Sequence, residues 1–402
     1  MNRKQFLLLL VLLVVLGGAG LLLQKNRDTA ANTGEQGAGQ KLLGEKFPVN
    51  DVAHIVVKHG TNELNLVKKD DRWRVRERSD YSANYSSIGD FLLKAAELKV
   101  VQADEIGASE LGRLELASGN ATNSGTVVEL KDKDDKTMRS ITLGKKHVRK
   151  SAQMSQFGDE GFPDGRYVMT AGDTHHALLI NDPLTTLEAK PEQWLKKDFF
   201  KIERPKAITV TFPEATNSWK LTRDTESGEW KLADAKPAEK LDTTKVSGVT
   251  SPFASPTLND VALSTAKPEE FGLDHPTTVV VETFDDYTYT VNVGKKVGED
   301  YSLSMTVSAN FPKERNPAKD EKPEDKDKAD KAFKDRQKTL EDKLKDAKNF
   351  EKWIYLVPSW NIDPVLKQRK DLFEEKKEEA KPGAAPADAA APSGIPGLPQ
   401  LK

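Results

Sequence analysis

Two stretches of this chain repeat the same order of short segments, and this repetition constrains the fold more than any other sequence feature. The first stretch begins with Ala53–Val57 and the second with Lys206–Val210. Each is followed by further runs in which apolar and polar residues alternate: Glu63–Val67 and Arg72–Val75, then Trp219–Leu221 and Glu229–Leu232. Alternation with a period of two is typical of a half-buried strand, so each stretch predicts an antiparallel three-stranded meander.

The later segments of the two stretches also match, in the same order. The pairs are Thr126–Leu130 with Thr278–Glu282, Ser140–Lys146 with Thr290–Lys296, Arg166–Val168 with Ile354–Leu356, and Asn181–Pro183 with Ile362–Pro364. Gly144 and Gly294 lie 150 residues apart, whereas Pro183 and Pro364 lie 181 apart. The increase coincides with a charged segment, residues 312–349, which only the second stretch contains. One insertion explains the change in spacing, and the repetition predicts two copies of one unit.

Helical patterns are fewer and differ between the copies. Ser86–Leu98 places its apolar residues on one helical face, with Ser86 or Ser87 as the expected N-cap. In the second copy Gly248, Pro252 and Pro256 interrupt the pattern, so its helix is expected to be shorter or distorted. Each copy is expected to close with a helix, over residues 191–200 and 364–379. Phe333, Leu340 and Leu344 form a stripe that predicts a solvated helix in the second half of the charged segment.

The N-terminus contains an uncharged apolar run, Phe6–Leu23, of 18 residues. As a helix it spans about 27 Å, enough to cross a bilayer's hydrocarbon core. Arg3 and Lys4 precede the run, so the N-terminus is expected in the cytoplasm and the body outside. A cleaved signal peptide is the alternative, but hydrophobicity resumes at Leu21–Leu23 where a cleavage region is expected. Either way the body is exported.

The fold class that follows is α+β: two tandem repeats of a mainly antiparallel β unit with one or two helices each, preceded by a single N-terminal transmembrane helix. Residues 1–23 are the cytoplasmic end and anchor, and 24–44 a flexible polar stalk. The repeat units are expected at 45–202 and 203–379, the second with the charged helical insertion 312–349. The tail 380–402 is rich in Ala, Pro and Gly, which predicts disorder.

These residues resemble a bacterial membrane-anchored family of unknown function with two repeated units. The resemblance is carried by Ile55–Val57, Trp73–Val75, the apolar helix Ile88–Leu98, Thr142–Gly144 and Tyr167–Val168, together with their second-copy counterparts. It implies genes beside those of gliding-motility-type ABC transporters, and hence an accessory role in such an assembly. The short second helix and the charged insertion depart from the family pattern. The family supplies no functional residue to carry over.

Composition excludes several functions. There are 61 Lys and Arg against 63 Asp and Glu, and this balance argues against a nucleic-acid partner. The chain has no cysteine, so thiolate catalysis, Cys-ligated zinc, iron–sulfur clusters and disulfides are excluded. No G-x-S-x-G elbow is present.

Several motifs allow a chemical interpretation and a simpler structural one. Gly144–Lys146 and Gly294–Lys296 lack the upstream Gly and following Ser/Thr of a phosphate-binding loop, which favours a strand-ending turn. His175 and His176 are adjacent, so on a strand they point to opposite faces and suit a solvated loop better than one metal ion. The Gly-rich residues 156–173, with Asp159, Glu160, Asp164 and Asp173, lack calcium-loop spacing, which favours a hairpin connection.

The expected function is a non-catalytic, membrane-anchored extracytoplasmic scaffold, an accessory component of an envelope or ABC-transporter-type assembly. No catalytic, cofactor-binding or metal-binding residue is assigned and no cofactor is expected. The expected partners are membrane lipid, through Phe6–Leu23, and envelope proteins that include ABC-transporter subunits. The protein is expected in the cytoplasmic (inner) membrane as a single-pass protein with its body in the periplasm or extracytoplasmic space.

Two alternatives remain open. A glycan-binding module would use exposed aromatic residues: Trp73, Trp230, Tyr287 and Tyr289. An envelope hydrolase would need converging acids near Asp159–Asp173.

Overall fold

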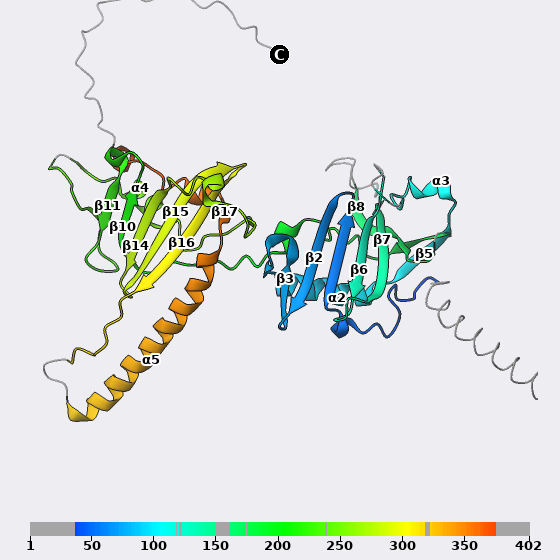
Figure 1. The fold of residues 1–402 in the computed structure, drawn as a ribbon, viewed down its shortest axis with the longest axis horizontal. Helices are drawn as coiled ribbons and strands as arrows, with labels where there is room; N and C mark the ends of the chain where they lie inside the picture. Colours follow the sequence, from blue (N-terminus) through cyan, green and yellow to red (C-terminus); the bar gives the residue numbers. More distant parts are fainter. Residues whose placement is uncertain are drawn as a thin grey trace, which may run out of the picture.

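The computed structural model describes residues 37–374 apart from 118, 120–122, 150–160, 174, 238 and 318–321. It contains two antiparallel sheets and few helices (Figure 1). No helix within these described ranges is both long and apolar enough to span a bilayer. The expected anchor Phe6–Leu23, the tail 380–402 and stalk residues 24–36 lie outside the described residues.

The first sheet has nine strands in the order β4-β3-β2-β1-β6-β7-β8-β9-β5. Every neighbouring pair is antiparallel, and the expected meander is confirmed as β1, β2 and β3. The strands are β1 His54–His59, β2 Asn62–Lys69, β3 Arg72–Val75, β4 Tyr81–Ser82, β5 Val100–Glu105, β6 Thr126–Lys131, β7 Thr137–Arg149, β8 Phe162–Thr170 and β9 His176–Ile180.

The second sheet has eight strands in the order β12-β11-β10-β14-β15-β16-β17-β13. They are β10 Pro205–Thr211, β11 Trp219–Thr222, β12 Lys231–Leu232, β13 Asp260–Val261, β14 Thr277–Thr283, β15 Tyr287–Val297, β16 Asp300–Ala309 and β17 Tyr355–Pro358. From β12 to β13 the order reproduces that of the first sheet from β3 to β5, and β4 has no counterpart. Ile55 and Ile208 occupy equivalent places, since each lies in the strand between the meander's second strand and the following long hairpin.

The sequence pattern explains the strands. β6 and most of β15 alternate strictly between buried and partly exposed residues, as expected for strands that cover a core with one face. Most buried apolar side chains of the two sheets form one contiguous cluster, and Ile106, Leu116, Met169 and Ala177 form a smaller one in the first unit. Because buried contacts cross from one unit to the other, the two sheets share a core.

Helix α2, Tyr85–Glu97, lies where the apolar face predicts it and buries Ile88, Phe91, Leu92 and Ala95. Its N-cap is Asn84, whose side chain accepts the Ser87 N–H, so the expected Ser86 or Ser87 cap is wrong. The second-copy helix α4, Thr243–Thr250, is shorter as expected and is capped by Asp242.

The charged insertion contains helix α5, Pro323–Lys348, as predicted for its second half. Leu340, Leu344 and Ala347, near its C-terminal end, pack against the core. Phe333 is only half-buried and lies outside that core contact. The orange helix therefore rests on the second sheet at one end and projects from it at the other (Figure 1).

The remaining helical segments are short. They are α3 Ala108–Leu111, α6 Ser359–Ile362, and the 3₁₀ turns η1 Val49–Asp51, η2 Arg76–Arg78, η3 Pro191–Trp194, η4 Ala215–Asn217, η5 Pro268–Phe271, η6 Asn349–Lys352 and η7 Arg369–Leu372. The expected closing helices are therefore wrong as far as residue 374: only η3 and η7 form. After η3 the chain pairs with β4, because Lys196 N–H donates to Ser82 O and Leu195 bridges Ala83. This pairing satisfies backbone groups that a helix would otherwise satisfy.

The first unit begins earlier than the sequence predicts. Leu42 and Leu43, assigned to the stalk, are each 1% exposed and belong to the core. Leu42 N–H donates to Leu98 O at 2.8 Å, and Lys41 bridges Lys99. Residues 41–44 are thus part of the first unit.

Candidate functional site

The two sheets meet at a polar contact between η2 and β13. Arg78 donates from Nε to Asp260 Oδ1 at 2.6 Å and from a terminal nitrogen to Oδ2 at 2.7 Å. Their side chains are 21% and 19% exposed, and the hydrogen bond to Asp260 raises the pKa of Arg78. A two-pronged arginine–carboxylate pair fixes orientation as well as distance. This contact therefore sets how one unit faces the other.

A second polar contact and a lysine that donates to both units lie beside it. The Ser264 N–H donates to Ser79 Oγ at 2.9 Å. Ser79 has a left-handed backbone with φ of 53°, which turns the chain sharply after η2. Lys197 donates to the carbonyl oxygens of Glu192 and Asn259, at 2.8 and 2.5 Å, and burial lowers its pKa. Backbone from both units is thus tied at the junction.

Aromatic packing continues the junction into the core. Tyr81 in β4 meets Trp353 edge-on with ring centroids 5.0 Å apart, and Tyr355 in β17 at 6.5 Å. Tyr355 also packs on Phe199, whose ring lies 5.8 Å from that of Phe350. Burial raises the pKa of Tyr81 to about 12. The phenol rings therefore act as packing groups, each edge-to-face pair contributing about 0.5–1.5 kcal/mol beyond burial.

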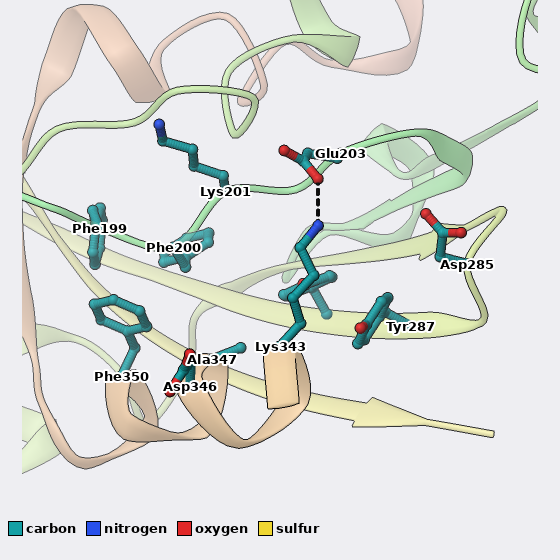
Figure 2. A pocket seen from close by; sticks show the side chains of 11 residues that line it. Phe199, Phe200, Lys201, Glu203, Asp285, Tyr287, Lys343, Asp346, Ala347 and Phe350 are labelled. Atoms are coloured by element: carbon teal, nitrogen blue, oxygen red, sulfur yellow. Dashed lines mark hydrogen bonds and ion pairs between the residues drawn. The ribbon is translucent and has the colours of Figure 1, made fainter. Parts of the chain in front are cut away.

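Phe199 and Phe350 of this aromatic cluster also line a cavity of about 220 Å³ at the C-terminal end of α5. Figure 2 shows side chains from the segment between the units, from the second sheet and from α5 pointing toward it. The lining residues are Phe199, Phe200, Lys201, Glu203, Asp285, Tyr287, Tyr289, Lys343, Asp346, Ala347 and Phe350.

Most polar groups of this cavity hold α5 in place. Glu203 accepts from Lys343 Nζ at 2.7 Å (Figure 2), and Asp285 accepts from Arg204 at 2.6 Å and Arg336 at 2.8 Å. Tyr287 donates its hydroxyl to Leu340 O at 2.7 Å. These contacts join the inter-unit segment and β15 to the insertion helix. The cavity therefore lies where α5 packs on the second unit, next to the junction.

Comparison with known proteins gives a family and no function. The profile described as "Domain of unknown function (DUF4340)" matches residues 73–276, just over half of the chain. The chain belongs to the DUF4340 family. No curated protein and no solved structure was found to match it. The DUF4340 match runs from β3 to the residue before β14 and so includes Arg78, Tyr81, Lys197 and Asp260.

In this DUF4340 protein the two Gly-Lys-Lys motifs lie inside strands. Gly144–Lys146 belongs to β7 and Gly294–Lys296 to β15, each at a shift in strand register. The expected strand-ending turn is wrong. A Cβ at Gly144 would collide with Leu114 O, and one at Gly294 with Phe271 O. Glycine is needed because a backbone carbonyl approaches the strand at both places.

The histidine and acidic motifs are dispersed. Asp173 accepts the backbone N–H groups of His175 and His176, and its carboxylate lies 2.9 Å from His176 Nδ1. Asp164 instead meets His147 Nδ1 at 2.6 Å. Strand β8 occupies half of the predicted loop at 156–173, so that loop is wrong over residues 162–170.

Asp159 and Glu160 lie outside the described residues. Within the described ranges, no three His, Asp or Glu side chains converge as metal ligands would.

The aromatic residues named for glycan binding are mostly interior. Trp73 is 6% exposed, and Tyr287 and Tyr289 are also buried. Trp230 is half-buried beneath Arg223, whose guanidinium carbon lies 4.8 Å from the ring centre. The junction residues Arg78, Tyr81 and Asp260 were not found from sequence.

Proposed function

We propose that this DUF4340 protein is a non-catalytic scaffold made of two copies of one duplicated unit. Phe6–Leu23 would anchor it in the cytoplasmic membrane as a single span, with the body in the extracytoplasmic space. There it would serve as an accessory component of an ABC-transporter-type envelope assembly. The shared strand order of the two sheets supports the duplication. The apolar run supports the anchor.

The observation that carries the scaffold role is the fixed junction. Arg78–Asp260 and Tyr81–Trp353 join strand β4 and its flanking turn to β13 and the segment before β17. β4 and β13 are edge strands, so the contact lies between the inner edges of the two sheets. A body that presents docking surfaces at a set separation needs such a contact, because units joined by a linker alone move independently.

The outer edges supply the docking surface in this proposal. They are β5 in the first sheet and β12 in the second. β12 has two residues, whereas β5 has six. The N–H and carbonyl groups of Val100, the first residue of β5, already pair with Gln40 and Gly39, so the edge left for a partner begins at the exposed Val101. An exposed edge strand offers unpaired backbone groups to a partner strand. The edge at β5 is therefore the preferred place for a partner protein, and α5 extends the surface at the other unit.

The proposal is tested by affinity purification of the full-length protein from detergent, with mass spectrometry of co-purifying chains. We expect ABC-transporter subunits. Asp260→Ala should reduce their recovery, because it frees the junction. Asp234→Ala is the matched control: Asp234 also pairs with an arginine, Arg369 at 2.6 Å, but away from the junction.

Two results would reject the scaffold role. One is recovery of glycan with no transporter subunit, which would favour the glycan-binding alternative. The other is equal recovery from the wild type and Asp260→Ala when hydrodynamic measurements show that the junction has opened.

A further inference from the structure

A second cavity, of about 310 Å³, lies at one end of the first sheet, away from the junction residues. It forms where β1 ends and β2 and β6 begin, with side chains from β7 and β8 and the segment after β9. Its lining residues are His59, Asn62, Thr126, Lys146, Arg166, Thr185, Leu187, Glu188, Ala189 and Lys190.

The lining is predominantly basic. It contains Lys146, Arg166, Lys190 and the imidazole of His59, against a single carboxylate, Glu188. Glu188 is already paired with Lys190 at 2.6 Å. No carboxylate of the described residues forms an ion pair with Arg166 or Lys146. Glu188 acts on both of these charges, and Glu115 on that of Arg166, only from beyond ion-pair distance.

Arg166 is held in place by backbone carbonyl oxygens. Its Nε donates to Gly144 O at 2.8 Å, and one terminal nitrogen faces the carbonyl oxygens of Leu184 and Pro183 at 3.4 and 3.5 Å. Burial lowers the pKa of Arg166. Carbonyl oxygens orient a guanidinium, but they do not compensate a charge that is partly removed from water. An anionic ligand would do so.

At the equivalent position in the second sheet, the protein itself supplies an anionic group. Lys146 pairs with Arg166 across β7 and β8, and the equivalent pair across β15 and β16 is Lys296 with Tyr301. There the Tyr301 hydroxyl donates to Asp363 at 3.0 Å, and Lys296 lies 3.9 Å from the same carboxylate.

The first unit has the matching aspartate but uses it elsewhere. Asp182, in the segment that corresponds to the one around Asp363, accepts from Leu184 N–H at 2.8 Å and pairs with Lys94 at 3.1 Å. The first unit therefore has Arg166 where the second has Tyr301, and its aspartate does not line the cavity. The carboxylate that does line it, Glu188, is paired with Lys190.

We propose that the cavity lined by Arg166 and Lys146 binds a phosphate group. The Arg166 guanidinium, whose second terminal nitrogen is not used by the backbone contacts above, the Lys146 ammonium and the Asn62 amide line the cavity from different strands. Donors on several sides suit a tetrahedral oxyanion with several acceptor oxygens better than a carboxylate, which one fork satisfies. The phosphate can belong to a soluble phosphomonoester or to the phosphodiester of a lipid headgroup, because both present anionic non-bridging oxygens that accept hydrogen bonds. This proposal does not depend on the scaffold role.

The test is isothermal titration calorimetry of the full-length protein in neutral detergent, with inorganic phosphate as the probe. We expect binding that weakens about tenfold or more in Lys146→Gln, a loss of about 1.4 kcal/mol. Arg166→Gln should abolish binding, and a thermal melt checks its fold. Lys146 is exposed, so its variant keeps the test valid if Arg166→Gln does not fold. Lys296→Gln, the equivalent position in the second unit, should bind phosphate as the wild type does.

Two further probes distinguish the sources of the phosphate. Tighter binding of glycerol phosphate than of a short-chain, soluble phosphatidylglycerol supports a soluble phosphomonoester. The reverse order supports a lipid headgroup. The proposal is overturned if no probe binds at millimolar concentration, if acetate or citrate binds as tightly as phosphate, or if Lys296→Gln weakens binding as much as Lys146→Gln. This measurement does not depend on the capture of partner proteins, so the phosphate site and the scaffold role can be rejected independently.

Discussion

The two sheets share an order of strands but are covered differently. In the first, the 13-residue helix α2 buries Ile88, Phe91, Leu92 and Ala95. In the second, the eight-residue helix α4 buries only Val246 and Val249. The second unit adds another cover, because Leu340, Leu344 and Ala347 of α5 pack on its core. The unit with the shorter helix is thus covered by α5 as well.

The strand beneath α5 also differs between the two units. Tyr287 and Tyr289 stand 150 residues after Thr137 and Arg139, the spacing of Gly144 and Gly294. The tyrosines are buried, and Thr137 at the first-unit position is exposed. A strand end that faces solvent in one unit therefore packs under a helix in the other. The comparison teaches that strand order is kept where the two sheets correspond, while the elements packed on them differ.

The largest expected effect tests the unequal helices. Ile88→Ala should lower the free energy of unfolding by about 2–5 kcal/mol, because a fully buried side chain leaves a cavity. Val249→Ala in α4 removes two methyl groups and should cost about 1.6 kcal/mol. Guanidinium denaturation followed by tryptophan fluorescence measures both. Equal losses of unfolding free energy would mean that the two helices contribute equally to stability.

The next effect tests the equivalence of the two Gly-Lys-Lys motifs. Gly144→Ala and Gly294→Ala should each destabilise by about 1–3 kcal/mol, because each Cβ meets a backbone carbonyl that cannot move aside easily. Gly89→Ala in α2 and Gly248→Ala in α4 are matched controls, since a Cβ has open space there. These should stabilise by about 0.5–1 kcal/mol. If Gly144→Ala keeps the stability of the wild type while Gly294→Ala does not, the two strand bulges are not equivalent.

Local periodicity predicted the strands of the meanders, the apolar face of α2 and the charged helix, because these depend on neighbours close in sequence. The cap of α2 was misplaced because Asn84, Ser86 and Ser87 are all good capping residues within one turn. The buried stripe starting at Ile88 does not decide among them. The closing helix after Pro191 was predicted from local pattern, but pairing of Leu195 with Ala83 overrides it.

The junction and the basic cavity could not be read from sequence. Arg78 and Asp260 are 182 residues apart, and no local pattern links them. Lys146 faces Arg166 only because a shift in register between β7 and β8 brings them into one pair. Such contacts depend on how whole units and strands dock, which a single sequence does not encode as a repeat or period.

A smaller effect compares the helix caps. Asn84→Ala and Asp242→Ala should each cost about 0.5–2 kcal/mol, with the greater loss at Asp242. Asp242 accepts two backbone N–H groups, at 2.9 and 3.1 Å, whereas Asn84 accepts one. Ser86→Ala, on an exposed residue inside α2, should change stability by less than about 0.5 kcal/mol. A Ser86 variant as damaging as the Asn84 variant would return the cap to the position that the sequence suggested.

The smallest effect concerns a buried polar network of the first unit. His54 is buried, with Nδ1 2.6 Å from Asp135 and Nε2 2.8 Å from Asn65 Oδ1. The Asn65 amide donates to Glu63 and Glu77, so its oxygen must face His54. The second unit has Ala207 where the first has His54, the residue before Ile208 and Ile55 respectively.

The hydrogen bond from His54 lowers the pKa of Asp135 below its ordinary value of 3.8. A carboxyl group with a depressed pKa stabilises the fold above its unfolded pKa, and that contribution disappears as pH falls through the lowered value. Asp135→Asn should therefore reduce stability near neutral pH, and the difference from wild type should shrink as pH falls below 3.8. Denaturation midpoints at several pH values measure this, with Asp134→Asn, on an exposed neighbour, as the control. If the difference in stability between the variant and the wild type stays constant with pH, Asp135 acts by packing or local turn geometry and not through the interaction of its charge with His54. The contrast between His54 and Ala207 would then be one of shape alone.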